Sequence, residues 1–500
     1  MTALCSRSYV AVCVERWAGG VPMTRVDAGV AGRRTTRLIK AAIAGVVAVV
    51  AAAIPSEALA GASARPAGGV AQDWPAYLDG PRHTSYAPAQ KAITPASVGD
   101  LVQAWHYGSG VDFFASPTVS GGAVFIGSGL GWFYKLNEAT GAVQARRFIG
   151  YRPAKTCASS LGTVATATVT DDPVTHRATV YVAGADGYLY ALNASNLALR
   201  WKAVIALPSA TTSNYFDWSS PTVANGRVYV GVASQCDKPQ VRGGVIAYNQ
   251  ASGRRLAAFY TVPKGSLGGA VWSSVAVAPN GDLFVSTGDG PATNQFLAYS
   301  ESIVKLNPRT LHVLGRFQVP ARQVGLDSDF GQSPVIFGSY VGACNKDGIF
   351  YLLSQATMKV RWEKRIGAAS YEGKTGECIA SPAYNGKVLY FGGNQTTIKG
   401  VTYQGSVQAR KPGSGQLIWE TPLADGVTGS PGLDGGGVLA VPGYYPPAGA
   451  TPEALYLIRA SSGRVVRILG NGDEFAQAVF AGGWLFSADS DGVYAWRVRD

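Results

Sequence analysis

A repeated short hairpin constrains the fold of this 500-residue chain more than any other feature. Its clearest copy runs from Ser220 to Gly231 and reads Ser-Pro-Thr-Val-Ala-Asn-Gly-Arg-Val-Tyr-Val-Gly. Alternating β-branched and aromatic residues favour two pleated strands, and Asn225-Gly226 supplies the positive φ angles that a two-residue hairpin turn requires. The stretch therefore predicts a β-hairpin, and variants of it recur along the chain.

Eight copies of this hairpin follow one another at intervals of about fifty residues. Most continue into a second apolar phrase such as Gly243–Asn249, and then into a strand that often carries Trp, as at Trp201, Trp362 and Trp419. Four short strands per unit at this period are typical of a β-propeller, because one such sheet buries its faces only against neighbours around an axis. We therefore predict an all-β fold, an eight-bladed β-propeller of four-stranded antiparallel blades. The copies open at Ser116-Pro117, Thr166-Ala167, Ser220-Pro221, Ser274-Val275, Ser333-Pro334, Ser381-Pro382, Ser430-Pro431 and Ala476-Gln477.

The two ends of the repeat array predict how the ring closes. The last copy runs out at Gly492–Trp496, its third strand, whereas Leu101–Trp105 lies before the first copy without a blade of its own. We expect this N-terminal strand to complete the last blade, which removes the exposed sheet edge of an open array. A stack of unclosed repeats is the alternative, and it would need capping units that the sequence does not contain.

The first sixty residues differ in character and predict an export signal. Basic residues precede a fourteen-residue apolar run, and small residues suited to a signal peptidase follow it. That run is short for a membrane-spanning helix, so we expect a secreted or cell-envelope protein with no integral span in the mature chain. The basic residues are Arg33, Arg34, Arg37 and Lys40, the apolar run is Ala41–Ile54, and the small residues are Ala58-Leu59-Ala60. The pair Arg33-Arg34 also raises the possibility of export by the twin-arginine route. Met23 is an alternative to Met1 as the first residue of the chain.

We therefore expect three regions along the chain. Residues 1–60 form an N-terminal extension and export signal, residues 61–72 a flexible tether of small residues, and residues 73–500 one large propeller. Removing the first sixty residues lowers the formal net charge from +12 to +8. This excess is spread along the blades without a basic run or a DNA- or RNA-binding motif, so we expect no nucleic acid partner. An anionic polymer or envelope surface stays open as a partner beside a merely solvated basic surface.

Strand order places certain loops on one rim of the predicted propeller. When four antiparallel strands meander outward from the axis, the loop before each first strand and the loop between the second and third strands face the same way. Four cysteines fall in these two kinds of loop. We predict disulfides between Cys157 and Cys236 and between Cys344 and Cys378, each joining neighbouring blades, over the two other connectivities; free buried thiols are the alternative.

Polar and aromatic residues from three adjacent blades gather in the same loops. Carboxylates, a lysine and two tryptophans together suit a flat anionic cofactor held by a hard cation, because Ca²⁺ takes oxygen ligands and an aromatic face stacks on a planar ring. We expect Trp272, Asp289 and Lys346 to meet over one mouth. Ordinary turn chemistry and propeller packing explain the same residue types without a ligand. The residues are Asp217, Trp218, Asp237, Arg242, Trp272, Thr287-Gly288-Asp289, Asp327-Ser328-Asp329 and Asn345-Lys346-Asp347.

From Trp74 to Trp496 the chain resembles the quinoprotein dehydrogenases that carry pyrroloquinoline quinone (PQQ) on an eight-bladed propeller, and especially their polyvinyl alcohol dehydrogenase-like relatives. The lead-in from Trp74 through His83-Thr84-Ser85-Tyr86 to Leu101–Trp105 is similar to the segment before the first blade of that family. The resemblance implies PQQ and Ca²⁺ as cofactors. It also implies an alcohol, polyol or sugar as substrate.

The resemblance implies a role for several rim residues. Trp272 resembles the tryptophan that forms the floor under the quinone, with Trp218 and Arg242 as further cofactor-binding candidates. Lys346 resembles the basic residue beside the quinone carbonyls, where a cation favours the charge of the reduced ring. Asp289, in Thr-Gly-Asp, stands where the family has a metal-binding Asn. Asp237 lies one residue from the position of the calcium-binding Glu.

The chain also departs from the family pattern. It has no pair of adjacent cysteines, and the catalytic aspartate expected before the third strand of blade 4 is missing from Asn294–Tyr299. Alcohol oxidation requires a base to take the hydroxyl proton. We predict Asp327 or Asp329 from the next loop in that role, with Glu301 as a stand-in. No Cys-x-x-Cys-His motif is present, so we expect no covalent haem.

Two functions follow as hypotheses. The first is an exported PQQ-dependent dehydrogenase that acts on a small-molecule or polymer substrate and passes electrons to a separate acceptor. The second is a cofactor-free PQQ-repeat propeller that binds a protein or polymer as a scaffold, since propellers host many unrelated activities. A hydrolase is disfavoured, because the chain has no Gly-x-Ser-x-Gly elbow and no metal-spaced histidine pair. The four histidines are His83, His106, His176 and His312.

Overall fold

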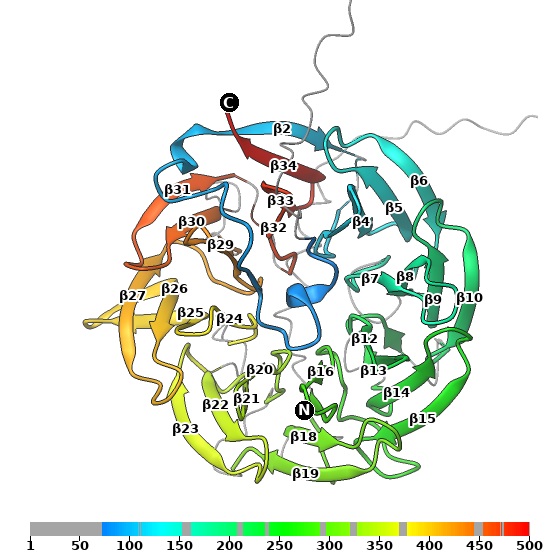
Figure 1. Cartoon of the computed structure of the whole chain (residues 1–500). Helices are drawn as coiled ribbons and strands as arrows, with labels where there is room; N and C mark the ends of the chain where they lie inside the picture. Colours follow the sequence, from blue (N-terminus) through cyan, green and yellow to red (C-terminus); the bar gives the residue numbers. More distant parts are fainter. Residues whose placement is uncertain are drawn as a thin grey trace, which may run out of the picture. The chain divides into compact units, whose positions relative to one another are not determined.

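The computed structural model confirms the eight-bladed, all-β propeller (Figure 1). Eight antiparallel sheets surround one axis, and the described residues contain only two short 3₁₀ turns, η2 (Tyr77–Asp79) and η3 (Val98–Asp100). The regions predicted at 1–60 and 61–72 lie outside the described residues. The structure describes residues 73–108, 110, 112–152, 162–207, 214–235, 240–290, 297–320, 328–369, 378–444, 454–470, 472 and 475–499.

Each blade begins near one of the eight predicted hairpins. Blade 1 contains β3 (Thr118–Ser120), β4 (Ala123–Gly127), β5 (Trp132–Asn137) and β6 (Val143–Phe148). Blade 2 contains β7 (Thr168–Asp171), β8 (Ala178–Ala183), β9 (Tyr188–Asn193) and β10 (Leu199–Val204). Blade 3 contains β12 (Thr222–Ala224), β13 (Arg227–Ser234), β14 (Gly244–Asn249) and β15 (Arg255–Tyr260), with β11 (Tyr215–Phe216) added to β13. Blade 4 contains β16 (Ala276–Val277), β17 (Leu283–Ser286), β18 (Ser302–Leu306) and β19 (Val313–Gln318).

The second half of the ring repeats this plan. Blade 5 contains β20 (Val335–Phe337), β21 (Tyr340–Cys344), β22 (Ile349–Ser354) and β23 (Val360–Arg365). Blade 6 contains β24 (Ala383–Tyr384), β25 (Leu389–Ile398), β26 (Val401–Arg410) and β27 (Leu417–Leu423). Blade 7 contains β28 (Gly432–Asp434), β29 (Val438–Pro442), β30 (Leu455–Arg459) and β31 (Val465–Leu469), and β1 (Tyr86–Ala87) pairs parallel to β28. Blade 8 contains β32 (Val479–Ala481), β33 (Trp484–Ala488), β34 (Val493–Val498) and β2 (Leu101–Tyr107).

The N-terminal strand closes the ring, as predicted. Strand β2 pairs antiparallel with β34, with Leu101 opposite Val498 and Tyr107 opposite Val493. One blade therefore contains strands from both ends of the propeller, and the sheet edge of the last repeat is covered (Figure 1). The second strand β4 is buried at every residue, whereas the outer strand β6 has only exposed and partly exposed residues. The core thus lies between neighbouring sheets.

Tryptophans of four outer strands dock on the next blade. Each indole N–H donates to a backbone carbonyl near the turn between the third and fourth strands of its neighbour. A glycine with positive φ in that turn, such as Gly141 (φ 71°), makes room for the ring. The bonds are Trp105 to Glu138 (2.9 Å), Trp201 to Gln250 (3.1 Å), Trp362 to Pro412 (2.9 Å) and Trp419 to Ala460 (3.1 Å).

A ring of hydrogen bonds surrounds the axis at the start of the blades. At seven of the eight junctions a backbone N–H donates to the side-chain hydroxyl of the next blade. The seven hydroxyls belong to the Ser or Thr that opens each repeat except the last, and we refer to them as the hydroxyl ring. The bonds are Ser116 to Thr166 (3.1 Å), Thr166 to Ser220 (3.0 Å), Ser220 to Ser274 (3.0 Å), Ser274 to Ser333 (2.8 Å), Ser333 to Ser381 (3.0 Å), Ser381 to Ser430 (3.0 Å) and Gln477 to Ser116 (2.9 Å).

The lead-in before the first blade occupies the axis below this ring. Residues Trp74 to Ala87, blue in Figure 1, run through the middle of the molecule and contact the first strands of six blades. These contacts fall three residues after six of the seven hydroxyl-ring positions, so the lead-in plugs the channel on one side of the ring. The backbone bonds run from Val169 to Pro75, Val277 to Pro81, Ile336 to Arg82, Tyr384 to Thr84 and Leu433 to Ser85, with a bridge between Trp74 and Val119.

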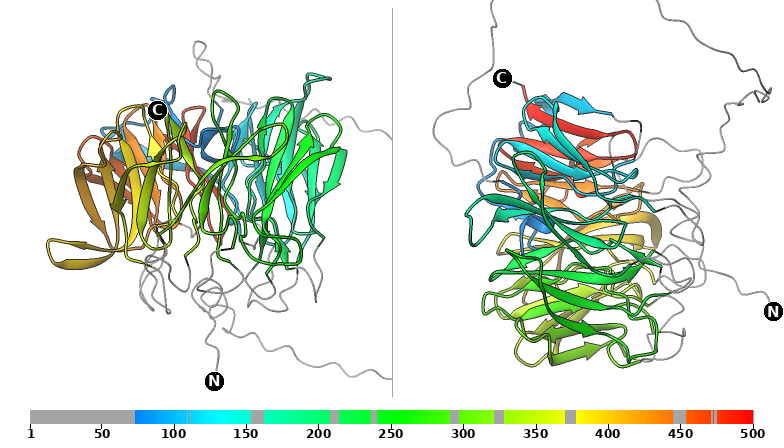
Figure 2. Two further views of the ribbon diagram at one scale, coloured as in Figure 1. Left: turned by 90° about the horizontal axis from the view of Figure 1, so that it is seen from below. Right: turned by 90° about the vertical axis from the view of Figure 1, so that its right-hand side faces the viewer.

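Figure 2 shows the blades edge-on, with their strands running between the two faces of the propeller. The hairpin of β25 and β26 is longer than the others and projects from the ring. No helix in the described ranges is long and apolar enough to cross a bilayer.

Two glycine substitutions test the docking of Trp105. Gly141 and Gly226 have nearly the same φ, 71° and 70°, so an added methyl group strains both backbones alike. At Gly141 the methyl would lie 2.6 Å from Cε3 of Trp105, whereas at Gly226 it meets nothing within 4 Å. We expect Gly141→Ala to lower the free energy of unfolding by about 1–3 kcal/mol more than Gly226→Ala. Calorimetry of the two variants measures the difference, and equal losses would contradict the docking.

Candidate functional site

Four predicted residues from blades 4 and 5 meet on one rim, and we refer to Trp272, Asp289, Asp329 and Lys346 as the rim cluster. Lys346 Nζ lies 3.4 Å from Asp329 Oδ2 and 5.4 Å from the centre of the Trp272 ring. The backbone N–H of Asp289 donates to Asp329 Oδ1 at 2.6 Å. The convergence of Trp272, Asp289 and Lys346 expected from strand order is therefore confirmed. Asp329 links the other members, a role that spacing alone did not indicate.

Backbone contacts hold these loops in place. Asp289 Oδ1 accepts the N–H of Ser328 at 2.9 Å, and the N–H of Lys346 donates to the carbonyl of Asp329 at 2.8 Å. Asn345 Nδ2 donates to the carbonyl of Ser328 at 2.6 Å. A Cβ on Gly288 would collide with Asp329 Oδ1, so a larger residue here would displace this carboxylate from the N–H of Asp289. The loops of the two blades therefore form one hydrogen-bonded unit.

Glu301 adds a buried carboxyl group beside the rim cluster. It is 1% exposed, its φ is 49°, and its Oε2 is buried without a hydrogen-bond partner. Burial raises the pKa of Glu301 to about 7, and the charge of Asp329 adds to this rise. A buried carboxylate oxygen without a donor is costly, so the site favours either a proton or a cation at Glu301.

The other predicted cofactor residues lie in different surroundings. Trp218 lies near the axis of the propeller, where it lines a pocket together with Phe475. The centroids of the two rings are 5.6 Å apart, and Trp218 Nε1 donates to the carbonyl of Ser234. Arg242 Nε donates to the carbonyl of Val262, and its guanidinium lies 4.1 Å from the centre of the Tyr260 ring. The described contacts of Arg242 therefore fall outside the rim cluster.

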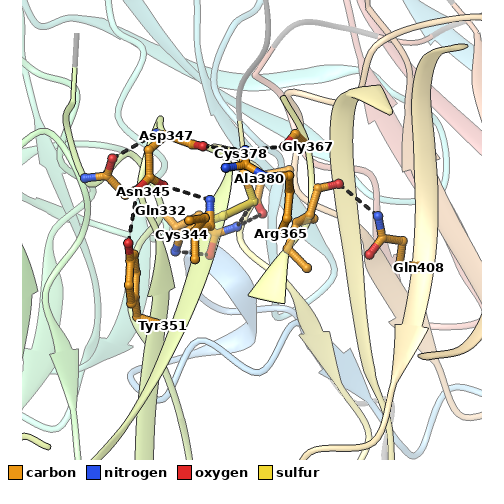
Figure 3. The surroundings of a disulfide bond; sticks show 12 residues. Gln332, Cys344, Asn345, Asp347, Tyr351, Arg365, Gly367, Cys378, Ala380 and Gln408 are labelled. Carbon is orange, nitrogen blue, oxygen red and sulfur yellow. Dashed lines mark hydrogen bonds between the residues drawn. A yellow bond between two sulfur atoms is a disulfide. The ribbon is translucent and has the colours of Figure 1, made fainter. Parts of the chain in front are cut away.

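The predicted disulfide between Cys344 and Cys378 is present and joins blades 5 and 6 (Figure 3). Both cysteines are fully buried, and their Cα atoms are 5.7 Å apart. Gln332 lies beside them, accepting the N–H of Cys344 and donating to the carbonyl of Ala380. Since Cys344 lies two residues before Lys346, the crosslink anchors the loop that carries the lysine.

Several predicted residues lie outside the described part of the chain. These are Asp237, Asp327 and the predicted pair of Cys157 and Cys236. Their roles remain predictions. Within the described ranges, no group of three or more His, Cys, Asp or Glu side chains forms a metal site.

The chemistry of the rim cluster fits a planar anion better than it defines a metal site. Trp272 offers an aromatic face, Lys346 a cation beside it, and Trp272 Nε1 is a buried donor without a hydrogen-bond partner. A flat, negatively charged ring system would stack on the aromatic face and pair with the cation. For a hard cation, the oxygen donors here are the carboxylates of Asp289 and Glu301.

The fold defines the class of protein, an eight-bladed β-propeller with four antiparallel strands in each blade. Residues 134–398, more than half of the chain, match the PQQ_2 family model, which is described as outer membrane protein assembly factor BamB. The chain belongs to this PQQ_2 family.

Known proteins are similar to this chain in sequence or in structure over the portions given below. Quinohemoprotein alcohol dehydrogenase ADH IIB of Pseudomonas putida is 26% identical, over 41% of this chain and 35% of its own length. The chain thus spans about a third of that relative. The solved quinohemoprotein alcohol dehydrogenase ADHIIG from Pseudomonas putida HK5 has a TM-score of 0.69 at 17% identity, covering 85% of this chain and 80% of its own. BamB from Moraxella catarrhalis has a TM-score of 0.52 at 14% identity, with coverages of 79% and 97%. The two structures show a shared fold.

A second buried carboxyl group, Asp217, gives a test by pH. It is 1% exposed, Val164 and Ala165 donate their backbone N–H groups to its Oδ2, and its Oδ1 has no hydrogen-bond partner. Burial raises its pKa from 3.8 to about 8. The folded protein therefore keeps a proton that the unfolded chain releases, and stability falls as pH rises through this window.

We expect Asp217→Asn, which cannot ionise, to gain stability relative to the parent chain between pH 5 and pH 8. Thermal melting of both proteins across this range measures the difference. A difference in melting temperature that stays constant with pH would contradict a buried, protonated Asp217.

Proposed function

We propose that this protein is an exported PQQ-dependent dehydrogenase-like propeller that oxidises an alcohol, polyol or sugar at the rim cluster. The observation that carries the proposal is the position of Lys346, whose ammonium group lies over Trp272 and beside Asp329. A stacking face, a cation and a carboxylate are the three groups that such a reaction requires of the protein. PQQ, when bound, would supply the two-electron oxidant.

Each residue of the rim cluster has a role in this proposal. Trp272 provides the surface on which the planar ring system stacks. Lys346 places a positive charge where negative charge develops during reduction. Asp329 accepts the hydroxyl proton of the substrate, as a general base must. The N–H of Asp289 and the ammonium group of Lys346 orient the carboxylate of Asp329 for that task.

We also propose Ca²⁺ as the metal, with Asp289 and Asp237 as ligands. The support is the oxygen donor set on the rim, together with the buried Glu301 Oε2, which has no hydrogen-bond partner. Hard cations prefer such carboxylate oxygens. In this proposal Glu301 is a further ligand, and the cation replaces the proton that burial otherwise favours.

The remaining features of the proposal follow from the sequence. The basic and apolar segments within residues 1–60 support export to the cell envelope or beyond, and residues 73–500 are the functional unit. Electrons leave to a separate acceptor, because the chain contains no Cys-x-x-Cys-His motif for a covalent haem of its own. The names of the relatives, quinohemoprotein alcohol dehydrogenases, support the reaction class.

The second candidate is a cofactor-free scaffold that binds a protein or polymer through its rim. Its support is the description of the matched family model, outer membrane protein assembly factor BamB. The two candidates differ in what Lys346 does. In a scaffold its contacts with Trp272 and Asp329 serve only to hold the loops together.

Cofactor binding separates the two candidates. We expect the purified chain to gain about 2.7 kcal/mol of stability in PQQ and Ca²⁺ at a hundredfold excess over the dissociation constant, because the ligands bind only the folded state. Trp272→Ala and Lys346→Met should reduce this gain. Lys399→Met, at the exposed tip of the hairpin of β25 and β26, is the matched control and should keep it. Calorimetric melting with and without the cofactors measures each shift.

If the parent chain shows no stabilisation at saturating PQQ and Ca²⁺, the dehydrogenase proposal fails and the scaffold is favoured. If Lys346→Met and Lys399→Met keep equal stabilisation, the cofactor binds elsewhere.

A further inference from the structure

Gln332 is a buried side chain beside the disulfide that joins blades 5 and 6 (Figure 3). Its Oε1 accepts the backbone N–H of Cys344 at 2.9 Å, and its Nε2 donates to the carbonyl of Ala380 at 2.6 Å. Nε2 also lies 3.4 Å from Cys378 Sγ. One amide group therefore bonds both to strand β21 of its own blade and to the segment that leads into the next blade.

Gln332 departs from the pattern of the repeats. The residue directly before the opening residue is small in each of the other seven repeats. A short side chain is enough for a bond within one blade, because Ser219 Oγ accepts the N–H of Gly231 at 2.9 Å, twelve residues later, as Gln332 does for Cys344. The extra length of Gln332 thus serves the second bond, to the next blade. The seven small residues are Ala115, Ala165, Ser219, Ser273, Ala380, Gly429 and Ala476.

The segments that Gln332 joins carry the two charged partners of the rim cluster. Asp329 lies three residues before Gln332, and Lys346 lies two residues after Cys344. The N–H of Lys346 donates to the carbonyl of Asp329 at 2.8 Å, and Nζ lies 3.4 Å from the Asp329 carboxylate. Because so few residues intervene, a shift of one segment against the other changes the distance between the ammonium group and the carboxylate.

The segment that leads into blade 6 also packs near Trp272. Gly331, directly before Gln332, lies between the two, since a Cβ there would be 2.6 Å from Ile379 Cγ2 and 2.8 Å from Trp272 Cη2. Ile379 comes directly before Ala380, the residue whose carbonyl accepts the bond from Gln332. The bond between the blades therefore also fixes the packing beside the aromatic face of the rim cluster.

The amide group of Gln332 and the disulfide restrain different motions. The crosslink limits how far Cys344 and Cys378 can separate, and their Cα atoms are 5.7 Å apart. Hydrogen bonds are directional, so the bonds of Gln332 to the N–H of Cys344 and the carbonyl of Ala380 also orient the two backbones. Together they hold the loop of Lys346 in distance and in direction.

We propose that Gln332 and the Cys344–Cys378 disulfide are positioning residues for Lys346, and that they hold its ammonium group beside Asp329 and Trp272 before a ligand binds. A cation that is already in place does not have to be ordered during binding, which strengthens the binding of an anion. The consequence for the cofactor rests on the proposed function. The position of Lys346 itself is measurable in the chain without a cofactor.

Acylation of lysine amines, followed for each lysine by mass spectrometry, tests the positioning role in the whole chain. The side chain of Lys346 is only 8% exposed, so Nζ reacts mainly when its contacts open. Gln332→Ser keeps a short acceptor within the blade, as Ser219 is, and loses the bond to Ala380. We expect Lys346 to react roughly 2- to 12-fold faster in this variant, the value of one hydrogen bond. The double variant Cys344→Ala, Cys378→Ala should react faster than the parent chain as well.

Two controls separate a loosened loop from a loosened protein. Lys305 forms an ion pair with Asp282 at 2.9 Å in blade 4, and its side chain is 14% exposed. Its rate should stay unchanged in every variant. Ser219→Ala removes the corresponding bond within blade 3 and should leave Lys346 at the rate of the parent chain.

Stabilisation by PQQ, measured by calorimetric melting of the same variants, connects this inference to the proposed function. Gln332→Ser should bind PQQ roughly 2- to 12-fold more weakly than the parent chain. Lys346 reacting at the parent rate in both Gln332→Ser and the double cysteine variant would overturn the positioning role, and so would equal increases at Lys346 and Lys305. If PQQ does not stabilise the parent chain but Gln332→Ser still speeds the reaction of Lys346 alone, the proposed function fails and the positioning role holds.

Discussion

Hydrogen bonds from seven of the eight blades to a hydroxyl group of the next blade set the geometry of this molecule. First strands crowd together at the axis, where their N–H groups have little water to bond with. At seven of the eight junctions, a Ser or Thr that opens the next repeat accepts such an N–H. Because each bond joins equivalent positions, the blades keep one register. Loops of the same kind then face the same mouth.

This register explains why charged side chains of blades 4 and 5 meet on the rim. Loops before first strands and loops between second and third strands meet beside Trp272, and there Lys346 compensates Asp329. A charged group in a partly solvated loop costs less free energy of desolvation than a charged group that is fully buried. The hydroxyl ring consists of neutral Ser and Thr side chains. The molecule thus places a charged cluster of side chains next to a ring of neutral hydroxyl groups.

The period of the repeats and the antiparallel strand order predicted the repeating parts of the structure. They predicted eight blades, closure by β2, the meeting of Trp272 with Lys346, and the disulfide of Cys344 and Cys378. They did not predict contacts that depend on side-chain direction or on segments without a period. Arg242 lies in a rim loop as predicted, yet its guanidinium stacks on Tyr260. The lead-in has no strand pattern, so its place on the axis was not foreseen. The opening Ser residues marked each strand in the sequence, but their role as acceptors required the neighbouring blade.

The central claim is that this register brings a stacking face, a cation and a carboxylate to one mouth. A crystal structure of the chain grown with PQQ and Ca²⁺ tests it most directly. The account predicts planar density stacked on Trp272, with Lys346 at its edge and Asp329 facing the open side of the ring. Planar density at another place on the propeller, or Trp272 and Lys346 on opposite sides of the molecule, would contradict it.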